Sequence, residues 1–151
     1  KDTFINYDNT STRHSPIIPA YFSIFEKIGI KDNIIRLLHL SISLLIFLIF
    51  YKFLKIKYLN INKQKLFIIS CLIFLSPTIR SLSIWPDSQV YGLFFFLLSV
   101  FAYLNFLNEK NNNKKFIFSI INIFCLALAS YIRPSFCLFS IFYFYNFFIN
   151  F

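Results

Sequence analysis

Long apolar runs alternate with short polar segments along this chain, and that alternation predicts its architecture. Four of the five runs approach the roughly 20 apolar residues that a helix needs to cross a bilayer. The sequence therefore predicts an all-α protein, a polytopic transmembrane helix bundle that forms one membrane domain over residues 1–151. The expected spans cover residues 35–51, 66–79 (extending as far as 85), 90–107, 116–132 and 136–151.

The second run differs from the others because it is short. As a helix, residues 66–79 would cover only about 21 Å, against a hydrocarbon core of roughly 30 Å. Ser76 and Pro77 follow its apolar core, and proline interrupts a regular helix. Such an interruption is tolerated at membrane depth only where protein or a water-filled cavity satisfies the backbone. We therefore expect a kink or break at Ser76-Pro77.

A shorter amphipathic segment precedes the spans. Residues 17–29 place most of their apolar side chains on one helical face, with Pro19 suited to a first turn and Gly29 to a C-terminal stop. Because this segment is too short to cross a bilayer, we expect a juxtamembrane amphipathic helix that lies in the interface. The helix would belong to an outer loop comprising residues 1–33.

Charged residues distinguish the two sides of the membrane. Residues 52–65 carry five lysines and no acid, and residues 108–115 carry three lysines and one glutamate. Cationic loops accumulate on the cytoplasmic side of membrane spans, so we expect both segments to be cytoplasmic loops. Residues 1–33, 80–88 and 133–134 then face outward, together with five of the six acids.

Composition excludes a soluble domain and disfavours a nucleic-acid-binding protein. The chain is 58% hydrophobic and only 14% charged. Its net charge of +9 comes largely from lysines beside apolar spans, which favours contact with membrane lipid over nucleic acid. With only two glycines, we expect little packing through small residues. Because methionine is absent and the chain begins in a polar stretch, we expect a fragment with at least one further span before Lys1.

Two arginines occupy positions that the charge rule does not explain. Arg80 and Arg133 end spans on the expected outer side, each near a proline. An arginine at a span end can extend its stem to reach lipid headgroups. It can equally line a polar cavity or bind an anion, because the planar guanidinium complements phosphate. Both interpretations are open, and under the second we expect the two guanidinium groups to meet around one lipid phosphate.

The other polar residues near this side have simpler interpretations. Trp85 suits an interfacial aromatic position, and His14 suits a loop. No second histidine lies near His14, so no metal site is predicted, although a divalent metal is left open as a cofactor without assigned ligands. His39 lies inside an expected span, a few residues from its outer end. A carboxylate on this side would accept a proton from an attacking hydroxyl.

The order of these features resembles the N-terminal half of the GT-C membrane glycosyltransferases, in particular family 39 and the aminoarabinose-transferase-like group. HSPIIPAYFSIFEKIGIKDNIIRLLHLSISLLIFLIFYKFLK is similar to their segment from the first outer loop to the second helix. SPTIRSLSIWPDSQVYGLFFFLLSVFAYLNF is similar to their third and fourth helices, and YIRPSF resembles the Arg-Pro that starts a following helix. The stretch YDNTSTRHSPIIPAYF also resembles the lipid-linked glucosyltransferases of the same superfamily.

The resemblance implies transfer of a sugar from a polyprenyl-phosphate-linked donor to an unknown acceptor at the outer membrane face. In that family an acid early in the first outer loop acts as base, which implies Asp8, with Asp2 in reserve. Basic residues hold the carrier phosphate, which implies Arg80 and Arg133. The further candidates for contacts with substrate are Asp87, His14 and Trp85.

Several alternatives stay open. The pair of adjacent acids that usually follows the family's first span is absent, so a base located before Lys1 is an alternative to Asp8. A transporter or flippase-like protein would place ionisable residues within its spans near the midplane. A polysaccharide polymerase or ligase would use similar lipid-linked substrates. In each case we expect an integral protein of a bacterial inner membrane, with membrane lipid and no nucleic acid among its partners.

Overall fold

The computed structural model describes residues 17–84 and 88–150, and every regular element within these ranges is a helix. This confirms the all-α prediction for the described part of the chain. The elements in order are α2 (Ile17–Lys27), α3 (Asp32–Lys57), α4 (Lys63–Cys71), the 3-10 helix η1 (Leu72–Leu75), α5 (Pro77–Ile84), α6 (Ser88–Asn108), α7 (Asn112–Ile132), the 3-10 helix η2 (Pro134–Leu138) and α8 (Phe139–Asn150).

Three of these helices have the length and hydropathy of membrane spans. They are Asn33–Lys57 within α3, α6 and α7, with mean hydropathies of 2.2, 2.0 and 1.9. The broken helix formed by α4, η1 and α5 makes a fourth span if its two parts are counted as one. The C-terminal apolar helix Pro134–Ile149 is shorter. The described residues therefore give three spans, or four, and do not confirm the five expected from the sequence.

The lysine-rich segments are more helical than predicted. α3 continues through Lys57 instead of ending at residue 51, so only residues 58–62 lie between α3 and α4. Similarly, only residues 109–111 lie between α6 and α7. Lysine has a high helix propensity, and its long stem lets the ammonium group reach headgroups while the backbone stays helical. The predicted extents of the loops at 52–65 and 108–115 were therefore wrong.

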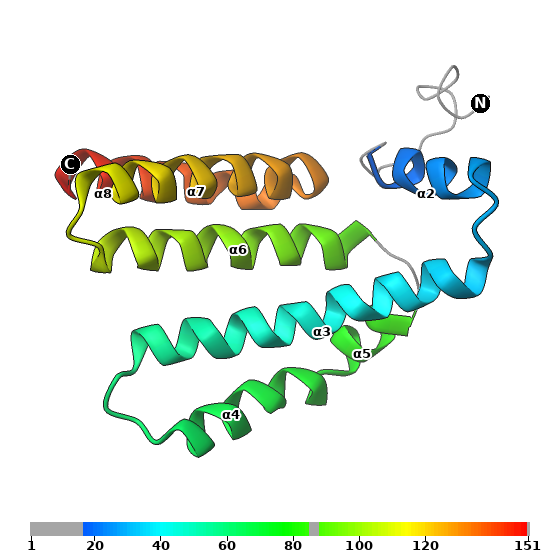
Figure 1. Ribbon diagram of the computed structural model, residues 1–151, viewed down its shortest axis with the longest axis horizontal. Coiled ribbons are helices and arrows are strands. Elements are labelled where there is room, and N and C mark those ends of the chain that lie inside the picture. Colours follow the sequence, from blue (N-terminus) through cyan, green and yellow to red (C-terminus); the bar gives the residue numbers. More distant parts are fainter. Residues whose placement is uncertain (1–16, 85–87, 151) are drawn as a thin grey trace.

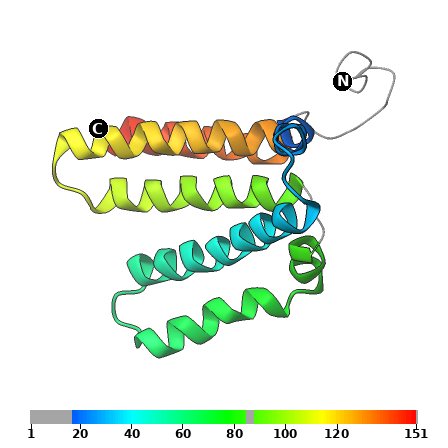
Figure 2. The same ribbon diagram turned by 45° about the vertical axis from the view of Figure 1, so that its right-hand side comes forward.

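The helices form layers, which Figures 1 and 2 show in the same order. α7 and α8 lie on one side of α6, α3 lies on its other side, and α4 lies beyond α3. α5 contacts both α3 and α6. One end of the bundle, which we call the lysine end, contains residues 52–65 and 108–115. The opposite end, which we call the arginine end, contains α2, α5 with Arg80, and Arg133. Both lysine segments thus lie at one end, as the charge pattern requires.

The most extensive packing lies between α6 and α7. The Nδ2 atom of Asn122 donates a 2.7 Å hydrogen bond across this contact to the carbonyl oxygen of Ser99. Small residues are part of this contact, since Ser119, Cys125 and Ala129 of α7 are buried. The buried face of α7 is formed by Ser119, Asn122, Cys125, Leu126, Ala129 and Ile132.

The break expected at Ser76-Pro77 is present. α4 passes through η1 and then bends by 75° into α5, which begins at Pro77. Pro77 has no N–H to continue the preceding hydrogen-bond ladder, and its ring disfavours helical backbone at the residue before it. Ser76 accordingly has an extended backbone with ψ of 119°. We call residues 72–77 the elbow.

α2 forms within the predicted amphipathic segment and ends at Lys27. Gly29 follows with a φ of 78°, and the N–H groups of Gly29 and Ile30 donate hydrogen bonds to the carbonyls of Glu26 and Phe25, at 2.9 and 3.1 Å. This is a Schellman cap, whose left-handed residue is usually glycine. Figure 2 shows α2 end-on at the arginine end, while α6 and α7 are seen from the side. α2 therefore runs across the direction of the spans.

The two ends provide a test of topology. In a variant whose native cysteines are replaced by alanine, a cysteine at exposed Ser81 should react with an impermeant maleimide in intact spheroplasts. Cysteines at exposed Asn60 and Asn113 should react only after the membrane is permeabilised, because lysine-rich segments resist translocation. Labelling at position 60 in intact spheroplasts, with position 81 protected, would reverse the expected orientation.

Candidate functional site at the arginine end

Most residues predicted for the site lie outside the described part of the chain, so their roles stay predictions. Arg80 and Arg133 are the two that the structure describes, and both lie at the arginine end. The predicted residues outside the described ranges are Asp2, Asp8, His14, Trp85 and Asp87.

Arg133 approaches α6 through its aliphatic stem. It follows α7 directly, and its N–H donates a 2.8 Å hydrogen bond to the carbonyl of Ala129. Its Cγ lies 3.3 Å from the position that a Cβ would take on Gly92 of α6. A larger residue at position 92 would crowd this stem, so Gly92 provides the room that Arg133 occupies. Because Arg133 is half-buried, water screens its charge less than that of an exposed arginine.

Arg80 is exposed and lies on a different helix. It is part of α5, which contacts α3 and α6, whereas Arg133 follows α7, which packs on another side of α6. The expectation that the two guanidinium groups meet around one phosphate therefore finds no support in the arrangement of these helices. Of the two, half-buried Arg133 is the better candidate for a phosphate ligand, because water screens an exposed cation more strongly.

An apolar groove of about 310 Å³ lies between α2, α3, α6 and α7, and Ile132, the residue before Arg133, is part of its lining. Tyr91 precedes Gly92 and Ile132 precedes Arg133, so the groove adjoins the place where the Arg133 stem approaches α6. Its volume is that of a small-ligand pocket, and its lining suits a hydrocarbon chain better than a sugar. The lining residues are Tyr21 of α2, Ile42 of α3, Tyr91, Phe94 and Phe95 of α6, and Leu128 and Ile132 of α7.

An aromatic contact attaches α2 to the groove. The rings of Tyr21 and Tyr91 meet edge-on with their centroids 5.9 Å apart, and Tyr21 also packs edge-on against Phe25 at 4.6 Å. Aromatic pairs in this geometry contribute about 0.5–1.5 kcal/mol beyond the area that they bury. α2 is therefore held over the groove by side chains that also form its lining.

His39 is a residue of this end that the sequence analysis did not assign to the site. It is completely buried in α3, and its Nε2 lies 2.7 Å from the carbonyl oxygen of Leu82 in α5. Because a carbonyl oxygen only accepts, Nε2 donates the hydrogen in this contact. The Nδ1 atom is buried and has no hydrogen-bond partner among residues 17–84 and 88–150. An ionisable residue within an apolar run was the signal that marked this position.

The His39 ring connects three helices. Besides its hydrogen bond to α5, it lies against the ring of Tyr91 on α6, with 5.6 Å between ring centroids. Tyr91 in turn contacts Tyr21 of α2. His39 therefore lies at the junction that positions the elements around the groove.

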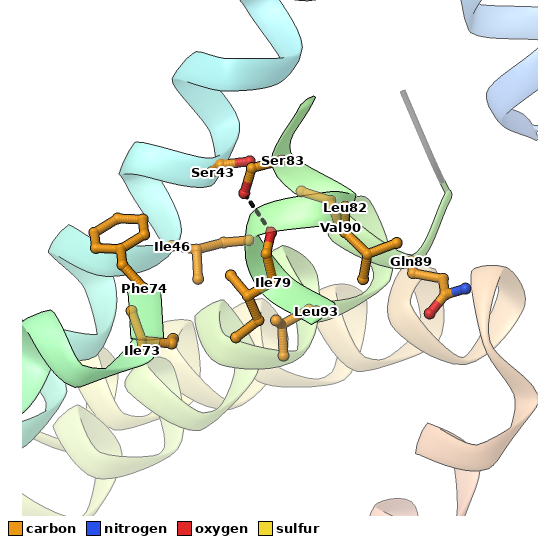
Figure 3. Close-up of a pocket in the computed structure, with 10 residues that line it drawn as sticks. All are labelled: Ser43, Ile46, Ile73, Phe74, Ile79, Leu82, Ser83, Gln89, Val90 and Leu93. Atoms are coloured by element: carbon orange, nitrogen blue, oxygen red, sulfur yellow. Dashed lines mark hydrogen bonds between the residues drawn. The ribbon is translucent and has the colours of Figure 1, made fainter. Parts of the chain in front are cut away.

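A second, much smaller cavity of about 20 Å³ lies under the elbow. Figure 3 shows Ser43 and Ser83 beside each other at its edge, with mostly apolar side chains around the rest. The Ser83 hydroxyl donates a 2.7 Å hydrogen bond to the carbonyl of Ile79. A cavity of this size accommodates about one water molecule and no sugar. It belongs to the packing of the break and is not a substrate site.

The described residues of the site supply no metal ligand set. No group of three histidine, cysteine, aspartate or glutamate residues comes together within the described ranges. The apolar groove is lined by two phenols and otherwise by apolar side chains. Among the described residues, this lining therefore favours contact with a hydrocarbon chain.

Comparisons with known proteins give no relative from which a function can be transferred. No protein-family model matches the chain, and no curated protein or solved structure is significantly similar to it. Any functional conclusion therefore depends on the residues of this chain.

Proposed function

We propose that this protein is a GT-C-type membrane glycosyltransferase that transfers a sugar from a polyprenyl-phosphate-linked donor to an acceptor at the outer membrane face. The observation that carries the proposal is half-buried Arg133, which directly follows Ile132 in the lining of an apolar groove of about 310 Å³. A lipid-linked donor requires both features, because its phosphate needs a cation and its isoprenoid chain needs an apolar surface.

The proposed reaction uses the Arg133 cation to stabilise the leaving group. The oxygen of an acceptor hydroxyl bonds to the anomeric carbon of the sugar, while the bond between that carbon and the phosphate oxygen breaks. Polyprenyl phosphate leaves with the electron pair, and Arg133 stabilises its negative charge. Asp8, with Asp2 in reserve, accepts the hydroxyl proton. Further substrate contacts are proposed for Arg80, Asp87, His14 and Trp85.

The proposal includes an orientation in a bacterial inner membrane. The lysine end faces the cytoplasm, as the positive-inside rule requires, and the arginine end faces outward. α2 lies in the outer interface, which its direction across the spans supports. The broken helix serves as one span and residues 136–151 as another, which makes five spans in all.

A transporter or flippase-like function is the second candidate, because His39 is completely buried within a span. Buried ionisable residues within spans often line transport pathways. His39, however, lies near the arginine end and bonds to the Leu82 carbonyl, which is a structural use of its ring. Interfacial transfer chemistry therefore remains the preferred function.

The experiment that separates these functions traces the fate of the donor. In membrane vesicles containing the protein and native acceptors, label from a radioactive polyprenyl-phosphate sugar should move to acceptor, while labelled nucleotide sugars should not be used directly. Movement of the intact lipid-linked sugar across the bilayer without cleavage would support the flippase instead. Growth of a polymer on the carrier would support a polymerase.

A further inference from the structure

A groove at the lysine end combines two ammonium groups with an apolar lining. α3 and α6 diverge toward this end in both views, and a groove of about 700 Å³ opens between them. Lys52 and Lys55 of α3 line the groove, and both are exposed. Its apolar lining comes from Ile56 of α3, from Leu59 in the turn after α3, and from Phe101 of α6.

The charge around this groove is strongly positive. Residues 52–65 and 108–115 together carry eight lysines and a single acid, Glu109. The Oε1 atom of Glu109 accepts hydrogen bonds from the backbone N–H groups of Lys110 and Asn111, at 3.1 and 3.3 Å. This carboxylate is therefore engaged within its own turn and does not line the groove. The groove therefore suits a ligand that has an anionic group and an apolar chain.

We propose that this groove binds one anionic phospholipid, with its phosphate between Lys52 and Lys55 and an acyl chain against Ile56, Leu59 and Phe101. Basic pockets between spans on the cytoplasmic side commonly bind such headgroups. A free phosphate would leave the apolar lining in water, where Leu59 is 85% exposed. A second copy of the chain would bring a further net charge of +9 against the same lysines. The lipid site is independent of the proposed sugar transfer.

A matched pair of double variants tests the site. The purified protein is titrated with phosphatidylglycerol and with phosphatidylcholine, and bound lipid is counted by native mass spectrometry. Replacing Lys52 and Lys55 with glutamine should weaken phosphatidylglycerol binding by roughly 25-fold, since each lysine near an anionic headgroup contributes about fivefold. Replacing exposed Lys110 and Lys114 with glutamine removes the same charge at the same end, outside the groove, and should change binding little.

Three results would overturn the proposal. Equal losses in the two double variants would mean that the lysine end attracts anionic lipid diffusely. Equal binding of phosphatidylcholine would show that the two ammonium groups select no headgroup. Displacement of the lipid by glycerol phosphate at matched concentration would show a site for free phosphate without a role for the acyl chain. Circular dichroism checks that each variant keeps its helix content, which exposed lysines on a helix end should not change.

Discussion

Replacing Arg133 with alanine should lower sugar transfer from the lipid-linked donor by roughly ten- to hundredfold. A hydrogen bond to a charged group contributes about 1.5–3 kcal/mol, and about 1.4 kcal/mol corresponds to a factor of ten. Arg133 is half-buried and directly follows a residue that lines the apolar groove, so its charge is poorly screened and its loss falls toward the upper part of that range. The measurement is the initial rate of label transfer in vesicles that contain equal amounts of each variant.

Three further variants identify the cause of that loss. Arg133→Lys should restore part of the rate, because it keeps the charge and loses the planar two-pronged donor. Gly92→Leu leaves the guanidinium in the protein and crowds its stem, so it should also lower the rate. Arg80→Ala should have a smaller effect, because Arg80 is exposed and its charge is screened. Near-normal transfer by Arg133→Ala would instead support the alternative interpretation, in which Arg133 only extends to the lipid headgroups and does not bind the donor phosphate.

The sequence predicted the long helices well because their signal is local. α6 and α7 begin and end near the predicted boundaries at residues 90–107 and 116–132, since each is a continuous apolar run between polar turns. The elbow was also predictable, because Pro77 removes a hydrogen-bond donor wherever it occurs. The end of α3 was not, because lysines favour helix and reach water through their stems, so hydropathy alone places the boundary too early.

The site was less predictable because its contacts join distant parts of the chain. Arg133 was selected by its position at a span end, but the room provided by Gly92 depends on how α7 packs on α6. The hydrogen bond between His39 and the Leu82 carbonyl joins residues that are 43 positions apart. The local sequence around either residue gives no pattern from which this bond could be predicted. The placement of Arg80 and Arg133 on helices that pack on different sides of α6 likewise depends on the arrangement of the helices, which the pattern of apolar runs does not determine.

Replacing His39 with alanine should loosen α5 from α3. The substitution leaves the Leu82 carbonyl without its donor and a cavity where the imidazole was buried. An unsatisfied buried acceptor costs about 1–3 kcal/mol, so the population in which α5 is detached should rise roughly tenfold or more. Ser83 is only 9% exposed, so a cysteine placed there reports this detachment. Its reaction rate with a maleimide, in purified protein whose native cysteines are replaced, should rise by a similar factor.

Two other substitutions separate the hydrogen bond from the volume of the ring. His39→Gln carries an amide N–H at nearly the distance of Nε2, so it should keep the cysteine at position 83 protected. His39→Phe fills the cavity without donating, so it should leave that cysteine more reactive than in the glutamine variant. Because α5 carries Arg80 on its exposed side, a detached α5 would also misplace that cation. Equal reactivity in the alanine, glutamine and phenylalanine variants would mean that α3 holds α5 by apolar packing alone, with no contribution from the His39–Leu82 bond.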